Sequence, residues 1–394
     1  MPSRNNRTKQ LTRQDNLKLS TESTAHGRAN DMKGVPLASL PSVDQCRSGA
    51  YTAMEQRAYS VYVPVIHNGK PLMPTTPSRA SSWIKDKKAT PFFKRGIFCV
   101  RLNKEPSSNE LQEIAVGIDP GSKKEGFTVK SESHTFLNIQ ADAVQHVKEA
   151  VEVRRNMRRS RRSRKTPCRV NRINRKYGNL SPSIKARWQW KLRIVQQLAK
   201  MFPITDLVVE DIKARIIAGK RKWNLNFSPL QVGKNWFYTE LKQFGNVHLK
   251  KGYETKALRD AAGLKKTKAK LSEVFEAHCV DSWVLANWYV GGHIIPDNNR
   301  MICVSPIRFH RRQLHVLQFK AGGMRKLYGG TRSCSFKRGS LIRHPKYGLA
   351  YIGGTMGSKI SLHSVVSGKR FCQNAKSIDI RFKTYNIWKT HIVA

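Results

Sequence analysis

Past its N-terminal part, the chain alternates between hydrophobic periods that are typical of strands and of helices. Apolar side chains at every second position predict a first strand at Val61, Val63 and Val65. Residues 1–57, in contrast, consist mainly of Ser, Thr, Asn, Arg and Lys. Such a segment buries too little surface to offset its ordering entropy, so we predict a disordered extension. Translation that starts at Met54 is an alternative to this long extension.

A small α+β module is expected at residues 58–112. Its turn-forming cluster is Asn68–Pro74, with the sequence NGKPLMP. A short helical stretch, Ser78–Lys88, follows the cluster, and a strand-like run, Ile97–Leu102, follows the helix.

The next and largest part of the pattern predicts a mixed sheet with flanking helices. We divide it into a first segment (113–143), a basic helix and linker (144–182, helical over 144–165) and a second segment (183–305). The apolar runs predict strands, in order, at Ile114–Asp119, Gly126–Lys130, His134–Ile139, Asp206–Glu210 and Val247–Leu249. They predict helices at Ser183–Met201, 234–243 and Glu273–Tyr289.

The final part, residues 306–394, contains short strand-like runs separated by glycine pairs. The pairs are Gly322-Gly323, Gly329-Gly330 and Gly353-Gly354. This spacing predicts a compact all-β domain at the C-terminal end.

The net charge of the chain indicates the kind of partner that it binds. Lys and Arg number 73 against 26 Asp and Glu, which gives a formal net charge of +47. Such a surface repels itself unless a polyanion neutralises it, and phosphates do so with release of condensed counterions. A membrane is disfavoured because the chain has no basic amphipathic helix, no lipidation motif and no apolar run of spanning length. Nucleic acid is therefore the expected partner.

The cysteines and the N-terminus indicate the compartment. The chain has 7 cysteines and no CxxC pair, which disfavours a zinc knuckle and a disulfide framework. The N-terminus lacks the apolar core of a signal peptide. We therefore expect reduced thiols in a cytoplasmic, nucleoid-associated protein of a bacterium, or in an organelle of an alga.

Four residues at the ends of predicted elements form a candidate metal-dependent nuclease site. Asp119 and Glu210 each end a buried apolar strand, and Pro120-Gly121 turns the chain sharply after the first. His278 and Asp281 are three positions apart, so on a helix they project from one face. Cleavage by two metals needs carboxylates that hold the ions about 4 Å apart. Mg²⁺ prefers such hard oxygen ligands.

Simpler interpretations exist for each residue alone. A single carboxylate at a strand end is more often solvated than catalytic, and a lone histidine such as His278 is more often a surface or core residue. Asp211 also competes with Glu210, although strand alternation points only one of them toward the site. The order of all four in so basic a chain favours the nuclease site.

A second candidate feature is the arginine density of residues 144–165. Guanidinium groups bind phosphates bidentately, so a helix charged on all sides fits between nucleic-acid segments. The alternative is a disordered basic tail of the ribosomal type. The candidate binding residues are Arg154, Arg155, Arg158, Arg159, Arg161, Arg162, Arg164 and Lys165.

Taken in series, these motifs resemble those of the transposon-encoded IscB and IsrB proteins, relatives of the CRISPR effector nucleases. Arg158–Arg162 matches their RRXRR pattern and Pro71–Pro74 their PLMP pattern. The segments IDPGS, LVVED and HCVDS, around Asp119, Glu210 and Asp281, are similar to the three motifs of RuvC nucleases. The resemblance, over roughly residues 59–385, implies an RNase H-like fold.

The same resemblance implies roles for the site residues. Asp119, Glu210 and Asp281 would be ligands of two Mg²⁺ ions, with Mn²⁺ as a possible substitute. His278 would be either a ligand or the general base. The arginine-rich segment would be the bridge helix that follows the first RuvC motif.

The interval before the third motif distinguishes the two branches of this family. IscB proteins carry an HNH nuclease there, and its site needs paired histidines or an Asn–His set. Between Asp211 and Ala277 the chain has only His248 and no cysteine. The resemblance is therefore to IsrB, without HNH.

An IsrB-like protein is expected to act as a monomer bound to a guide (omega) RNA. Base pairing would select double-stranded DNA, and one nuclease centre would nick the non-target strand. The C-terminal β domain would read a short motif beside the target. The alternatives are a guide-dependent DNA-binding protein without cleavage and an RNA-independent RuvC-like nuclease.

Overall fold

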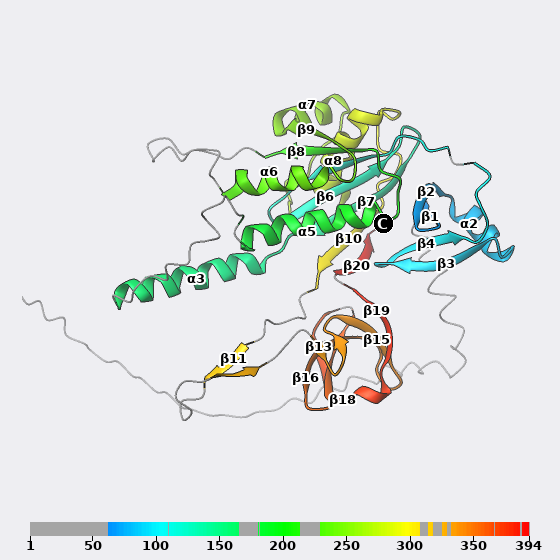
Figure 1. Cartoon of the computed structure of the whole chain (residues 1–394). Coiled ribbons are helices and arrows are strands. Elements are labelled where there is room, and N and C mark those ends of the chain that lie inside the picture. Colours follow the sequence, from blue (N-terminus) through cyan, green and yellow to red (C-terminus); the bar gives the residue numbers. More distant parts are fainter. Residues whose placement is uncertain are drawn as a thin grey trace, which may run out of the picture. The chain divides into compact units, whose positions relative to one another are not determined.

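The computed structural model describes residues 62–108, 110–164, 180, 182–212, 229–307, 314–317, 325–328, 332–365, 367–386 and 388–393 (Figure 1). The predicted N-terminal extension, Val61 and Lys165 lie outside the described residues. Within the described part of the chain, no helix is long and apolar enough to cross a membrane.

A seven-stranded mixed sheet forms the centre of the fold, in the order β20-β10-β7-β6-β5-β8-β9. Its strands are β5 (Ala115–Asp119), β6 (Lys124–Lys130), β7 (Thr135–Asp142), β8 (Asp206–Asp211), β9 (Asn246–Lys251), β10 (Met301–Pro306) and β20 (Trp388–Val393). Strand β6 is antiparallel to both β5 and β7, β8 is parallel to β5, and β9 is parallel to β8. This is the strand arrangement of an RNase H-like fold, as predicted.

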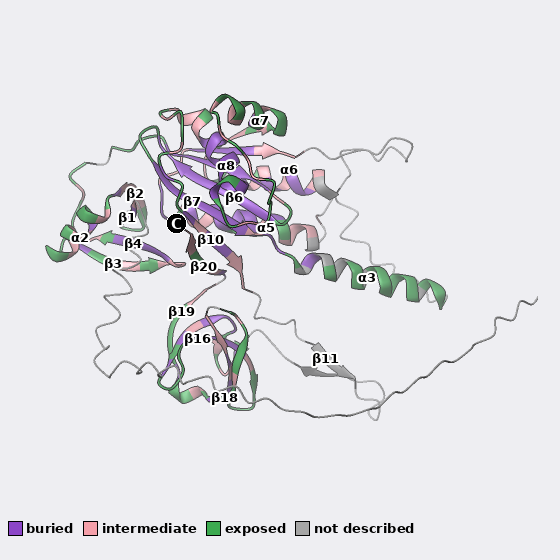
Figure 2. Ribbon diagram, turned by 180° about the vertical axis from the view of Figure 1, so that it is seen from behind, coloured by how far each residue is buried: buried purple, intermediate pink, exposed green. Residues whose placement is uncertain are grey.

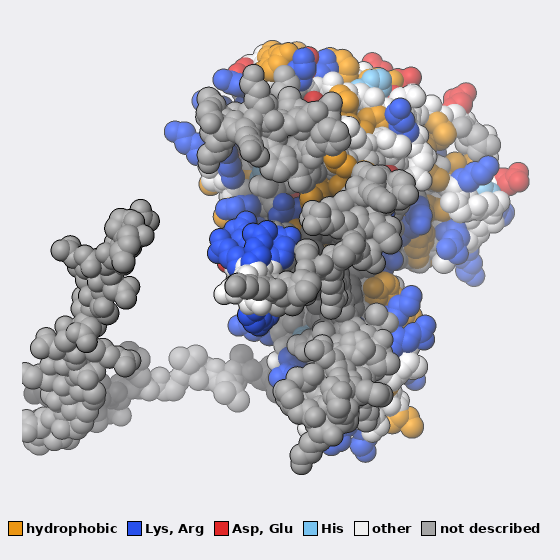
Figure 3. Space-filling model, turned by 60° about the vertical axis from the view of Figure 1, so that its left-hand side comes forward, with side chains coloured by type: hydrophobic (Ala, Val, Ile, Leu, Met, Phe, Trp, Pro, Cys, Tyr) orange, Lys and Arg blue, Asp and Glu red, His pale blue; other side chains and the backbone are white. Residues whose placement is uncertain are grey.

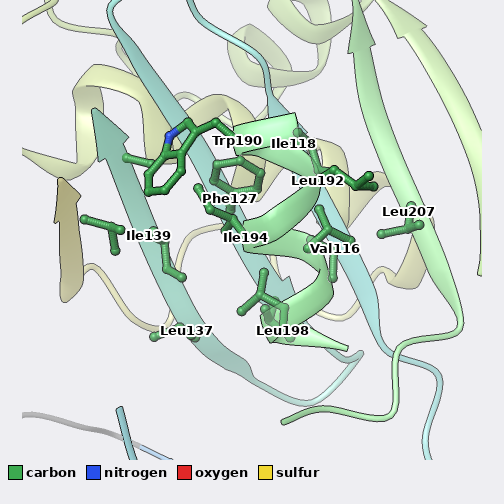
Figure 4. Close-up of a cluster of buried hydrophobic side chains, with 14 of the residues drawn as sticks. Val116, Ile118, Phe127, Leu137, Ile139, Trp190, Leu192, Ile194, Leu198 and Leu207 are labelled. Carbon is green, nitrogen blue, oxygen red and sulfur yellow. The ribbon is translucent and has the colours of Figure 1, made fainter. Parts of the chain in front are cut away.

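Strands β5, β6 and β7 are buried along almost their whole length because helices cover both faces of the sheet (Figure 2). Helix α5 (Pro182–Leu198) packs on one face, where Trp190, Leu192, Ile194 and Leu198 join the apolar side chains of the strands (Figure 4). Helix α8 (Phe275–Val290) contacts β5 and β6 on the other face. A strand presents alternate residues to each helix, so apolar and functional positions separate onto opposite faces.

Two glycines let α8 approach the sheet closely. A Cβ added to Gly117 would lie 1.8 Å from the carbonyl oxygen of Ser282, and one added to Gly126 would lie 2.3 Å from that of His278. Both carbonyls belong to α8, so the helix backbone rests directly on β5 and β6. The first turns of α8 are thereby fixed beside the end of β5.

Three further helices extend from or cover this sheet. They are α3 (His146–Ser163), α6 (Pro229–Leu241) and α7 (Gly252–Ala261). The sequence pattern predicted the first two, whereas α7 was not predicted. It is short and mostly exposed, and its sequence contains no continuous apolar run.

The N-terminal module is a four-stranded sheet in the order β2-β1-β4-β3 with one helix. Its elements are β1 (Val63–His67), β2 (Lys70–Thr75), α2 (Pro77–Lys85), β3 (Ala89–Lys94) and β4 (Ile97–Leu102). Our interpretation of Asn68–Pro74 as a turn was wrong beyond Gly69, because β2 starts at Lys70 and pairs with β1. Pro71 and Pro74 are tolerated because β2 is an edge strand, where a missing N–H costs no ladder bond.

The C-terminal part contains a five-stranded antiparallel sheet in the order β18-β17-β16-β15-β19. Its strands are β15 (Ser340–His344), β16 (Gly348–Met356), β17 (Lys359–Ser364), β18 (Arg370–Lys376) and β19 (Arg381–Tyr385). The short pairs β11 (Leu314–Leu317) with β12 (Arg325–Tyr328) and β13 (Arg332–Ser333) with β14 (Phe336–Lys337) precede it in the chain.

One strand of the expected C-terminal domain belongs elsewhere. The prediction of an all-β domain over 306–394 differs from the structure at its end, since β20 pairs along its length with β10 of the central sheet. Strand β10 in turn pairs in parallel with β7. The strand period of β20 was readable in the sequence, but its partner depends on a contact between distant parts of the chain.

Candidate active site

Asp119 is the last residue of β5 and is buried. The Gly121 N–H donates to the Asp119 carbonyl oxygen at 3.0 Å, so the chain turns immediately after the carboxylate. In the β5–β6 ladder Asp119 pairs with Gly126, the glycine that faces α8. The Asp119 side chain therefore points toward α8 rather than into the α5 core.

Glu210 lies beside Asp119 because β8 runs parallel to β5, with Ile118 opposite Val209. The carboxyl ends of the two strands thus meet at one edge of the sheet. Asp211 points away: it forms an ion pair with Lys234 at 2.7 Å and accepts a hydrogen bond from Tyr238 at 2.9 Å. Strand alternation therefore brings Glu210, and not Asp211, to the site.

Helix α8 adds the third carboxylate and the histidine. Asp281 lies on the buried face of α8, and one oxygen each from Asp119, Glu210 and Asp281 can be chosen so that all lie within 4.8 Å of one another. His278 lies one turn earlier and contacts Asp119, with 3.0 Å between Nδ1 and Oδ2. Its Nε2 lies 3.1 Å from the carbonyl oxygen of Lys270. The structure thus brings together all four predicted residues.

Two basic side chains that the sequence analysis did not select also enter the site. Arg259 of α7 donates to Asp281 Oδ1 at 2.5 Å. Lys266, in the loop between α7 and α8, donates to Asp281 Oδ2 and lies 3.8 Å from Asp119 Oδ2. Among 73 lysines and arginines, no local signal distinguishes these two. Their role follows only from the tertiary contact.

The carboxylates differ in acidity because they share one buried space. Burial raises the pKa of Glu210 to about 8, and the negative charges of Asp119 and Asp281 add to the effect. Burial also acts to raise the pKa of Asp119, but the hydrogen bond from His278 and the charge of Lys266 outweigh it and lower that pKa. Near neutral pH the metal-free cluster therefore holds a proton, which resides on Glu210.

The donor set fits a hard divalent cation. The three groups offer only carboxylate oxygens, which Mg²⁺ and Mn²⁺ prefer to nitrogen or sulfur. Each carboxylate comes from a different element, and each is buried or half-buried. Lys266 and Arg259 place positive charge beside Asp281. A cation at the cluster would replace the Lys266 ammonium at Asp119 and Asp281.

A buried ion pair between Glu125 and Lys191 lies beside the turn after Asp119. Glu125 of β6 is fully buried and accepts a hydrogen bond from Lys191 of α5 at 2.5 Å. Lys191 also lies 3.4 Å from the carbonyl oxygen of Gly121. The other oxygen of Glu125, Oε2, has no hydrogen-bond partner among the described residues. Burial raises the pKa of Glu125, and Lys191 opposes that shift.

The arginine-rich segment is helical, as predicted, and belongs to α3. Basic side chains predominate over acidic ones on the face drawn in Figure 3. The side chains of Arg154 and Arg161 are not described, and Lys165 lies outside the described residues. The other candidate side chains are exposed and therefore available to phosphates: Arg155, Arg158, Arg159, Arg162 and Arg164.

The described cysteines form no disulfide. They are Cys99, Cys279, Cys303, Cys334 and Cys372, and all five are free.

Comparison with known proteins supports the resemblance drawn from the motifs. Residues 61–220 match the model of a family described as RRXRR protein, a segment that includes the PLMP and arginine-rich motifs and Asp119 and Glu210. No curated protein matches the chain.

Two solved structures are similar to part of the chain. One is T. thermophilus RuvC in complex with a Holliday junction substrate, with 12% identity and a TM-score of 0.27, covering 46% of this chain and 98% of that one. The other is the yeast mitochondrial Holliday junction resolvase Ydc2, with 12% identity and a TM-score of 0.24, covering 45% and 78%.

Proposed function

We propose that this RNase H-like protein, which matches the RRXRR family over residues 61–220, is an RNA-guided DNA endonuclease of the IsrB type. It binds a guide (omega) RNA, pairs that RNA with one strand of double-stranded DNA, and nicks the other strand. The observation that carries the proposal is the meeting of Asp119, Glu210 and Asp281 within 4.8 Å in so basic a chain.

Asp119, Glu210 and Asp281 would hold divalent cations, Mg²⁺ by preference, through their carboxylate oxygens. When bound, the ions supply charge that activates the attacking water and stabilises the leaving oxygen. The close packing of α8 on β5 and β6 keeps the three carboxylates in place. Both ring nitrogens of His278 already contact oxygen atoms, which supports a positioning role through Asp119.

Binding of nucleic acid is assigned to the basic surface. The exposed arginines of α3 can contact phosphates on several sides of the helix, since a helix distributes successive residues around its axis. The protein would therefore hold the RNA–DNA duplex by its backbone while base pairing reads the sequence. We assign recognition of a short motif beside the target to the C-terminal β domain.

A single nuclease centre supports nicking rather than double-strand cleavage. The chain between Asp211 and Ala277 has one histidine, so it offers no pair of histidines for an HNH site. Among described residues the interval is occupied by α6, β9 and α7. Strand β9 belongs to the central sheet.

The test uses purified protein, its guide RNA, a supercoiled target plasmid and Mg²⁺. We expect a nicked circle that requires the RNA, and no product with an Asp119→Asn variant. A linear product would contradict the nickase, and nicking at the level of the variant would contradict catalysis. Activity that survives ribonuclease treatment would instead favour an RNA-independent nuclease.

The contribution of α3 has its own test. Replacing Arg158 and Arg159 with glutamine should weaken RNA binding and flatten the dependence of the logarithm of affinity on the logarithm of salt. Each phosphate that the variant no longer neutralises should reduce that slope by about 0.7–0.9. Unchanged affinity and slope would contradict phosphate binding by α3.

A further inference from the structure

A second group of side chains with metal-ligand chemistry lies where β10 and β20 pair. Cys303 of β10 and His391 of β20 are directly opposite each other in the antiparallel ladder. Directly opposed residues project from the same face of a sheet, with their Cβ atoms about 4.5–5.5 Å apart. The strand register therefore places the thiol and the imidazole side by side.

Glu273 completes the group from another part of the chain. It lies two residues before α8 begins, and its Oε2 is 2.8 Å from His391 Nε2. Its other oxygen, Oε1, accepts a hydrogen bond from Lys124 at 3.1 Å. Lys124 thus contacts Oε1, whereas Oε2 contacts the imidazole.

The donor atoms of these three residues all lie within 4.8 Å of one another. Tetrahedral zinc, with Zn–N and Zn–O near 2.0 Å and Zn–S near 2.3 Å, separates its ligand atoms by roughly 3–4 Å. Sulfur and imidazole nitrogen are ligands for zinc and similar first-row metals, whereas Mg²⁺ prefers oxygen. The set therefore differs in kind from the carboxylate cluster.

We infer that Glu273, Cys303 and His391 form a zinc site with a fourth position open to water, separate from the candidate nuclease site. Burial fits this assignment. Cys303 is 3% exposed and forms the floor of the site. The side chains of Glu273 and His391 are 42% and 51% exposed, so an ion can enter from solvent between them.

Such a site would join three segments that are distant in the sequence. It links the C-terminal strand β20 to β10, and links both to the start of α8, which carries His278 and Asp281. Metal at this point would stabilise the attachment of β20 and restrain the first turn of α8. Its occupancy does not depend on whether the protein cleaves DNA.

The test is a titration of the full-length protein with Co²⁺, a spectroscopic substitute for Zn²⁺, followed by displacement with Zn²⁺. We expect a thiolate-to-cobalt charge-transfer band and visible bands of tetrahedral cobalt that saturate at one equivalent. Zn²⁺ should abolish both, whereas excess Mg²⁺ should not. Absence of the charge-transfer band in the wild-type protein would overturn the inference.

Variants assign the ligands. Cys303→Ser should lose the charge-transfer band, while Cys279→Ser, at another buried free cysteine, and Asp119→Asn should retain it. His391→Gln changes a half-exposed residue, so it should fold, and it should weaken Co²⁺ binding at least about tenfold. A band that persists in Cys303→Ser, or undiminished affinity in His391→Gln, would overturn the assignment.

Discussion

His278 Nδ1 lies 3.0 Å from Asp119 Oδ2, and this contact joins helix α8 to the end of strand β5. The other ring nitrogen faces the carbonyl oxygen of Lys270 at 3.1 Å. Each ring nitrogen therefore contacts an oxygen atom from a different segment of the chain. His278 therefore orients Asp119 and the loop before α8 at the same time.

We expect His278→Ala to reduce nicking by roughly 10–100-fold while divalent-metal binding is largely retained, as is usual for a residue that supports a ligand. Nicking rates and Mn²⁺ affinity, measured on the same preparation, test this. A loss of metal binding as large as that in Asp119→Asn would show that His278 is a ligand.

Substitutions of the adjacent residues Glu210 and Asp211 should differ sharply in their effects on metal binding. Glu210→Gln should abolish nicking and weaken metal binding, because Glu210 shares the cluster with Asp119 and Asp281. Asp211→Asn should retain metal binding and lose some stability, because Asp211 contacts Lys234 and Tyr238 instead. Metal titration and thermal unfolding of the two variants provide the comparison. Equal loss of metal binding in both would contradict the strand alternation described.

The acidity of Glu210 predicts how pH affects the protein. Its pKa is raised from 4.5 to about 8, so between these values the folded protein binds more protons than the unfolded chain. The free energy of unfolding of the metal-free protein should therefore fall as pH rises through this window. Mg²⁺ requires the ionised carboxylate, so it should raise Tm more at about pH 8 than at about pH 6.

Thermal unfolding with and without Mg²⁺ across this window tests that expectation. The Glu210→Gln variant is the control, since it should lose the part of the slope that comes from Glu210. A Tm increase by Mg²⁺ that is the same at both pH values would contradict the prediction.

Lys266 should compete with metal for the carboxylates it contacts. Lys266→Met should lower the Mg²⁺ concentration needed for half-maximal nicking, because the metal ion no longer has to displace the Lys266 ammonium from Asp281. It should also destabilise the metal-free protein. The cost should be below the roughly 3–5 kcal/mol that breaking a buried pair can reach, because Arg259 still contacts Asp281.

Metal-dependent nicking and metal-free unfolding of Lys266→Met measure both effects. Lys265→Met removes a neighbouring, exposed lysine of the same loop and should change neither. If Lys266→Met raises the Mg²⁺ requirement, the ammonium assists metal binding and the prediction is wrong.

The packing of α8 predicts a stability effect away from the carboxylates. Gly117→Ala and Gly126→Ala place a Cβ against the α8 backbone, 1.8 Å and 2.3 Å from carbonyl oxygens that cannot yield easily. Each should cost about 1–3 kcal/mol or more of unfolding free energy and displace α8, with loss of nicking.

Chemical denaturation measures this cost. Gly354→Ala in β16 is the control, since its Cβ would meet no atom closer than 3.8 Å and should leave stability nearly unchanged. Wild-type stability in Gly117→Ala would contradict the close approach.

The local pattern of the sequence determined the elements that position the site. The buried strands that carry Asp119 and Glu210 at their ends are short apolar runs, and the helix that carries His278 and Asp281 is a longer apolar segment, so neighbouring residues alone reveal them. The arginine-rich helix was readable from its basic composition instead. Helix α7 and strand β2 were not predicted, because the short exposed helix has no apolar run and the edge strand contains prolines that are typical of a turn.

Only the tertiary structure decided which side chains meet. Lys266 and Arg259 reach Asp281, and β20 leaves the C-terminal β domain to place His391 beside Cys303. These pairings depend on strand register and on helix docking across long sequence separations, which no local period records. The sequence thus determined which side chains lie at the ends of the strands. The tertiary structure decided which basic and metal-binding side chains lie beside one another.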